Sequence, residues 1–136
     1  MGESVLADAG FIVALLNRDD RHHPWATALA ARYARPWRTC EAVLSEAFFI
    51  LPASGIASLS ELLRRRSLLI AFELEAHLDA VLRLMHKYAN VPMSLADGCL
   101  VRMSETVDSQ IVLTTDSDFR IYRRHGRNVV PCVLPP

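Results

Sequence analysis

The stretch MSLADGCLVRMSETVDSQIVLTTDSDF, residues 93–119, decides how the rest of the chain is interpreted. It predicts a helix with Asp97 in its first turn, followed by the apolar strand IVL, which runs into Asp116. A carboxylate just past the carboxyl end of a strand lies where open α/β sheets bind ligands. The first apolar segment of the chain, VLA, also ends in an acid, Asp8. If these two strands are parallel, both acids reach the same edge of one sheet.

Strands and helices alternate along the chain, with no internal repeat or linker between them. Apolar patterning predicts strands at residues 5–7, just before Thr39, and at 68–72, 111–113 and 129–130. Helices are expected at 11–16 after a turn at Gly10, and at 24–33, 41–51, 60–66, 73–88, from 94 onward and at 119–124. This alternation predicts an α/β fold in three layers (α/β/α), with a central, mostly parallel sheet of four to five strands. Residues 1–136 are expected to form one domain.

Composition restricts the class of protein. A hydrophobic content of 51% with 22% charged residues is typical of a globular protein, not a disordered one. The formal net charge is zero, so any contact with nucleic acid must come from local basic clusters. The three cysteines are widely spaced and form no C-x-x-C pair, which favours reduced cysteines in or near the core. No signal peptide or membrane span is evident, and we expect a cytoplasmic protein.

Glu46 is unusual for its apolar surroundings. Its helix reads EAVLSEAFFIL, with apolar residues on nearly every side of Glu46. A buried carboxylate needs a partner or a metal ion, and this interpretation is favoured. The alternative is a narrow solvated stripe that Glu46 shares with Glu41 and Ser45.

The other three acids each have a structural explanation as well. Asp8 can cap the helix that follows it, and Ser94 with Asp97 matches a capping box. Asp116 can cap the helix that contains Phe119. A capping role and a role at the sheet edge are compatible, because a cap also fixes where the carboxylate lies.

Taken together, Asp8, Glu46, Asp97 and Asp116 form a set of oxygen ligands. Carboxylates gathered at one edge repel each other unless a cation neutralises them, and such clusters suit Mg²⁺ or Mn²⁺. Bound metal ions can activate water and stabilise the leaving oxygen of a phosphodiester. Asp118 could share the metal with Asp116 or replace it as the fourth ligand.

In the order of its segments the chain resembles the PIN-domain ribonucleases, and among them the VapC-type toxins of toxin–antitoxin pairs. The segments are VLADAGFIVALLNRDDRHHPWA, TCEAVLSEAFFIL, SLADGCLVRMSE and IVLTTDSDFRIYR. The resemblance implies a PIN-like fold and an acidic quartet of Asp8, Glu46, Asp97 and Asp116 that binds Mg²⁺ or Mn²⁺, with Thr115 as the hydroxyl residue before the last acid. It also implies cleavage of RNA, a neutralising antitoxin protein and a homodimer. Many relatives have Thr or Ser directly after the first Asp, where this chain has Ala9 and Gly10.

Two other functions fit parts of the sequence less well. A PIN-fold module without catalysis, serving as an RNA binder or scaffold, is disfavoured because all four acids are present. A haloacid-dehalogenase-like phosphatase needs a D-x-D motif after the first strand, and Asp8-Ala9-Gly10 lacks the second Asp. The basic group Arg120, Arg123, Arg124, His125 and Arg127 either binds RNA phosphates or forms a solvated helix face.

Overall fold

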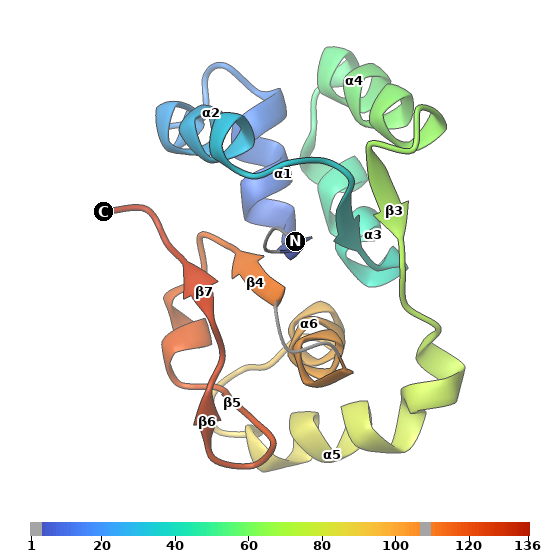
Figure 1. Cartoon of the computed structure of the whole chain (residues 1–136), viewed down its shortest axis with the longest axis vertical. Coiled ribbons are helices and arrows are strands. Elements are labelled where there is room, and N and C mark those ends of the chain that lie inside the picture. The colour runs from blue at the N-terminus through green and yellow to red at the C-terminus, as the bar shows by residue number, and fades with distance from the viewer. Residues whose placement is uncertain (1–3, 107–109) are drawn as a thin grey trace.

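The central sheet has five strands, and every pair of neighbours is parallel. The structure is a computed structural model that describes residues 4–106 and 110–136 (Figure 1). The strands lie in the order β3-β2-β1-β4-β7. Their bounds are β1 Ser4–Ala7, β2 Trp37–Thr39, β3 Leu68–Ile70, β4 Gln110–Leu113 and β7 Cys132–Val133.

Helices flank this sheet and complete the predicted three-layer α/β/α fold. They are α1 Ala9–Leu16, α2 His23–Arg32, α3 Glu41–Ile50, α4 Ala53–Arg64, α5 Leu78–Lys87 and α6 Leu95–Thr106, with 3-10 turns η1 Leu74–His77 and η2 Ser117–Arg120. A separate antiparallel hairpin joins β5 Arg123–Arg124 to β6 Asn128–Val129. Figure 1 shows α5 and α6 side by side, with the hairpin near the C-terminal end of α5. Within the described residues, no helix combines the length and apolar character that crossing a membrane requires.

The register of β1 and β4 places the ends of both strands at the same level. Ala7 pairs with Leu113, so Asp8 and Thr114 both follow directly at the carboxyl edge. The backbone N–H of Asp8 still donates to Leu113 O at 3.0 Å, which extends the pairing by one step. The expected meeting of two strand ends is therefore confirmed.

The core explains why these strands are apolar throughout. Leu6 and Val112 are fully buried because the central strands are covered on both faces. Phe11 of α1 packs edge-on against Trp37 of β2, with ring centroids 5.6 Å apart. Cys40 and Cys99 are buried and all three cysteines are free, as expected.

Two helices begin earlier than the sequence predicted. Helix α1 begins at Ala9 because Asp8 caps it, and Gly10 is helical, so the predicted turn at Gly10 is wrong. Helix α4 begins at Ala53, directly after Pro52 at the N-cap, instead of at residue 60. Proline is well suited to a helix start, because the missing N–H has no helical partner there.

Four further expectations are wrong in the second half of the chain. The single helix over 73–88 is divided into η1 and α5 at His77. The helix over 119–124 is a 3-10 turn that ends at Arg120, followed by β5. The fifth strand of the sheet is β7, while Val129 belongs to the hairpin. Strand β3 ends at Ile70, two residues earlier than predicted.

Candidate active site

Asp8 lies directly after β1 and is 6% exposed. Its Oδ1 accepts the backbone N–H of Ala9 at 2.7 Å, which makes it the N-cap of α1. Its Oδ2 accepts the hydroxyl of Thr114 at 2.6 Å. The capping interpretation of Asp8 is confirmed, and the same bonds hold its carboxyl at the sheet edge.

Thr114 connects two of the predicted acids. Besides donating to Asp8, its Oγ1 accepts the backbone N–H of Asp116 at 3.0 Å. Asp116 in turn caps η2, with Oδ1 accepting the N–H of Asp118 at 2.9 Å. The sequence interpretation gave Thr114 no role, although its place between a buried strand and an acid was the available signal.

Asp97 lies in the first turn of α6 and is 7% exposed. The predicted capping box is confirmed, because Asp97 N–H donates to Ser94 Oγ at 3.1 Å and Ser94 N–H donates to Asp97 Oδ2 at 3.2 Å. The hydroxyl of Tyr122 also donates to Asp97 Oδ2, at 3.2 Å. No local pattern singled out Tyr122, whose segment was predicted as a helix.

Glu46 is exposed, so the prediction of a buried carboxylate is wrong. Helix α3 packs on the core through Val43, Leu44 and Ala47, and this leaves its other side in solvent. That side includes Phe49, which is 91% exposed, so apolar neighbours did not indicate burial. Glu46 therefore belongs to the exposed stripe that was the alternative interpretation.

The carboxyls nevertheless act on one another electrostatically. Burial raises the pKa of Asp8 to about 7, and the carboxylates of Asp97 and Glu46 add to this increase. Although Glu46 is exposed, the part of its side chain that is removed from water raises its pKa, and the carboxylates of Asp97 and Asp116 add to this increase. Burial also raises the pKa of Asp97, and Asp116 adds to it, while hydrogen bonds from Ser94 and Tyr122 lower it.

Asp116 and Asp118 differ in the groups that they influence. Asp116 raises the pKa of both Glu46 and Asp97. Both aspartates raise the pKa of the Tyr122 hydroxyl, behind burial and Asp97, and Asp116 contributes more than Asp118. Asp116 therefore lies electrostatically within the acidic group, and Asp118 is at its margin.

The acidic group has no basic counter-charge in the described part of the chain. The ion pairs there join Arg65 to Glu61 and Arg102 to Glu105, away from these acids. The donor chemistry, carboxylate oxygens without a basic partner, fits a hard divalent cation. As the side chains stand, however, no three described His, Cys, Asp or Glu residues lie close enough to share one metal ion. Carboxylates of like charge repel one another where no cation lies between them.

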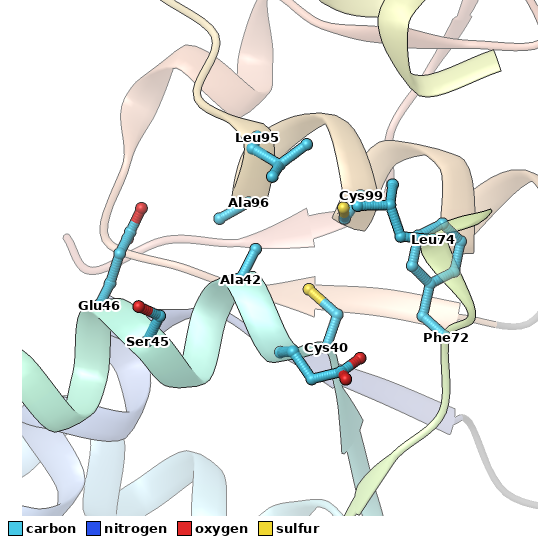
Figure 2. A pocket seen from close by; sticks show the side chains of 10 residues that line it. Cys40, Ala42, Ser45, Glu46, Phe72, Leu74, Leu95, Ala96 and Cys99 are labelled. Carbon is cyan, nitrogen blue, oxygen red and sulfur yellow. The ribbon is translucent and has the colours of Figure 1, made fainter. Parts of the chain in front are cut away.

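A cavity of about 530 Å³ adjoins Glu46, between α3 and α6. Figure 2 shows Glu46 at one end and Phe72 with Leu74 at the other, with the sulfurs of Cys40 and Cys99 between them. Its lining is mainly apolar, in contrast to the acidic edge beside it. The sequence interpretation did not anticipate this cavity.

Gly10 belongs to the Ala9-Gly10 pair in which this chain differs from many relatives, and the structure gives a steric reason for a glycine there. A Cβ added at Gly10 would lie 2.0 Å from Thr115 Oγ1, which is far inside contact distance. Gly10 therefore lets the Thr115 side chain lie against the first turn of α1. The resemblance implies that Thr115 is the hydroxyl residue before the last acid, and in the structure this hydroxyl lies beside Gly10 of α1.

The arginines after Asp116 are partly committed to structural roles. Nη1 of Arg123 donates to the carbonyls of Arg120, Ile121 and Tyr122 at 2.7, 3.1 and 2.9 Å. Nη1 of Arg124 donates to Ser104 O at 2.9 Å. These two guanidinium groups stabilise the turn before the hairpin and its junction with α6.

A family model described as PIN domain matches residues 5–124. Since the match covers most of the chain, the protein belongs to the PIN domain family. PIN domains are typically nucleases, and the nucleases among them generally use divalent metal ions. No curated protein sequence matches the chain.

Proposed function

We propose that the protein is a Mg²⁺- or Mn²⁺-dependent endoribonuclease that hydrolyses RNA phosphodiester bonds. The observation that supports this best is the group of four acids, which come from separate elements of a PIN domain; burial and neighbouring carboxylates raise the pKa of three of them, Asp8, Glu46 and Asp97. A cation relieves this repulsion, and phosphate oxygens can complete its coordination. The donor chemistry of the four acids and the family therefore favour the same chemistry.

In this proposal Asp8, Glu46, Asp97 and Asp116 hold the metal, with Asp118 outside the set. When bound, the metal would supply Lewis-acid stabilisation of the phosphate and a water of lowered pKa. Thr114 and Tyr122 position two of the acids through their hydroxyl bonds to Asp8 and Asp97. Positioning of this kind keeps the carboxylate oxygens aimed before the substrate arrives.

We further propose that the enzyme acts in the cytoplasm as a VapC-like toxin, silenced by an antitoxin protein. The support is the resemblance of the four sequence segments described above. The experiment is co-expression with proteins encoded beside it. Rescue of growth and formation of a stable complex are expected, and a chain that is harmless when expressed alone contradicts the toxin role.

A homodimer is part of the same proposal. Phe49 and Ile50 at the end of α3 are 91% and 59% exposed, and Ile56 on α4 is 38% exposed. Exposed apolar side chains on adjacent helices are typical of a contact surface. Light scattering should give twice the chain mass for the wild type and the chain mass for Phe49→Arg. Equal masses for both proteins would contradict this surface.

The nuclease is tested by incubating purified protein with total cellular RNA in Mg²⁺, in Mn²⁺ or in EDTA. Discrete products are expected with metal and none with EDTA. Asp97→Asn should remove at least about 10²-fold of the rate, because it deletes a charged ligand while an amide oxygen can still accept the capping bonds. Asp19→Asn, in an exposed loop, is the matched control. Wild-type cleavage by Asp97→Asn would contradict the assignment.

A further inference from the structure

A second cavity, of about 320 Å³, lies between α5, the C-terminal half of α6 and the turn of the β5–β6 hairpin. Its lining is basic: Arg83 and Lys87 come from α5, Arg102 from α6 and His125 from the hairpin turn. Glu105 is the one acid among its lining residues. Although the net charge of the chain is zero, acids gather at the sheet edge and basic groups gather at this cavity.

The carboxylate of Glu105 is already engaged inside the protein. Its Oε1 accepts from Arg102 Nη1 at 3.2 Å, and its Oε2 accepts the backbone N–H of His125 at 2.8 Å. Neither Arg83 nor Lys87 forms an ion pair with any acid that the structure describes, including Asp79 one turn before Arg83. The positive charge of α5 is therefore available to a ligand.

The basic groups are held in place by contacts of their own. Lys87 Nζ donates to Gly126 O at 2.9 Å and lies 5.4 Å from the centre of the Tyr88 ring. Nε of Arg102 donates to His77 Nδ1 at 3.0 Å. A ligand that binds positively charged groups already fixed in this way loses less free energy to side-chain ordering. Lys87 keeps two further N–H groups for such a ligand.

The basic cavity is physically connected to the acidic group. Tyr88 follows Lys87 and packs edge-on against Tyr122, with ring centroids 5.1 Å apart. Tyr122 donates to Asp97, as described above. Arg102 and Asp97 share α6, and five residues correspond to about 7.5 Å along a helix axis. At 3.6 residues per turn the two positions also lie about 140° apart around α6, so one polymer contacts both regions by passing around the helix.

We propose that Arg83, Lys87, Arg102 and His125 bind the phosphodiester backbone of single-stranded RNA on one side of the bond that is cut. The proposal rests on the nuclease function proposed above. An acidic site repels phosphates, so affinity for RNA must come from positive charge elsewhere. Arg83 and Lys87 lie one turn apart on one helix face, and such a row suits a chain of phosphates better than a single ion.

The cavity also supplies the phosphate-binding groups that the arginines after Asp116 do not supply. Arg123 and Arg124 were candidates for phosphate binding, but each directs Nη1 to backbone carbonyls. The hairpin contributes His125 instead, whose backbone, with φ of +53° at the turn, is held by the hydrogen bond that its N–H donates to Glu105 Oε2. The basic surface of the hairpin is therefore completed by α5, far from it in sequence.

The test is binding of a fluorescently labelled single-stranded RNA in EDTA, where no metal-dependent cleavage occurs, over a range of salt concentrations. Arg83→Ala/Lys87→Ala should weaken binding about tenfold or more and reduce the salt slope by about 1.4, or 0.7 for each lost phosphate contact. The control Arg18→Ala/Arg64→Ala removes two exposed charges elsewhere and should change neither. The charge-preserving Arg83→Lys/Lys87→Arg should retain the wild-type slope.

Equal binding by the cavity variant and the control overturns the proposal, and so does absence of RNA binding by the wild type at low salt. With metal present, the cavity variant should raise KM for a long RNA, leave kcat unchanged and cleave a dinucleotide like the wild type. If the wild type binds RNA in a salt-dependent way but shows no metal-dependent cleavage, the nuclease proposal is rejected and the RNA-binding role of the cavity is retained. If the cavity variant cleaves long RNA with the wild-type KM, the nuclease proposal is retained and the RNA-binding role of the cavity is rejected.

Discussion

Asp8→Asn should make the metal-free protein more stable at pH 8. The substitution keeps the size of the side chain and an oxygen that can accept the N–H of Ala9, but it removes the charge. In the wild type, burial raises the pKa of Asp8 from 3.8 to about 7. A carboxylic acid with a raised pKa is easier to ionise in the unfolded chain, so the unfolded state releases its proton first as pH rises. Stability therefore falls from about pH 4 to above pH 7.

The magnitude follows from the shift. A difference of about 3 pKa units corresponds to about 4 kcal/mol at pH 8, at 1.36 kcal/mol per unit. Rearrangement of the Thr114 hydroxyl bond in the variant offsets about 1 kcal/mol of this gain. We expect Asp8→Asn to gain about 2–3 kcal/mol at pH 8, which corresponds to about 6–9 °C in melting temperature for a chain of this size. The gain should become small at pH 5.

The assay is thermal unfolding in EDTA at pH 5 and pH 8, with Asp19→Asn as the control for loss of one acid. The titration is then repeated with millimolar Mg²⁺ or Mn²⁺. Metal should raise the melting temperature of the wild type, more at pH 8 than at pH 5 because protons compete for Asp8, and should do little for Asp8→Asn. A variant less stable than the wild type at pH 8 in EDTA would refute the reasoning, since it would mean that the charge of Asp8 is compensated in the folded protein.

Two further pairs of substitutions test the site. Gly10→Ala places a Cβ 2.0 Å from Thr115 Oγ1, so it should lower both the melting temperature and the rate of RNA cleavage, and adding Thr115→Ala should restore part of the melting temperature. An unchanged rate and melting temperature for Gly10→Ala would contradict this packing. Asp116→Asn should lose at least about 10²-fold of the cleavage rate, while Asp118→Asn keeps most of it at the same melting temperature. Equal losses of cleavage rate in Asp116→Asn and Asp118→Asn would mean that Asp118 is also a metal ligand.

The sheet could be predicted because its strands are short, apolar and separated by helices. Buried parallel strands such as β1 need apolar residues on both faces, and their ends are marked where polar residues begin. The acids Asp8 and Asp116 stand at those points, so their shared edge followed from chain order alone. What the sequence could not supply was the partner of each acid, because Thr114 and Tyr122 reach them through hydrogen bonds formed only in the fold.

Three of the errors share a physical origin, which is apolar side chains that remain in solvent. Phe49 and Ile50 gave α3 the appearance of a buried helix around Glu46, yet both are exposed. Ile121 and Val129 are 48% and 63% exposed, and they produced the false helix and the false fifth strand. The hairpin between them has strands of two residues, too short for an alternating pattern, and Gly126 with φ of +82° was its only local signal.

Asparagine and alanine substitutions differ in whether they can separate the structural role of Asp8, Asp97 and Asp116 from their catalytic role. Oδ1 of Asp8 and Oδ1 of Asp116 each accept a capping hydrogen bond, and Oδ2 of Asp97 accepts the hydrogen bonds from Ser94 and Tyr122. Alanine at any of these positions removes a helix cap as well as a charge, so a loss of activity would have two causes. Asparagine retains an oxygen for the cap and removes only the charge. An Asn series that keeps the fold and loses cleavage would therefore assign the chemistry to the carboxylates, whereas an Ala series could not.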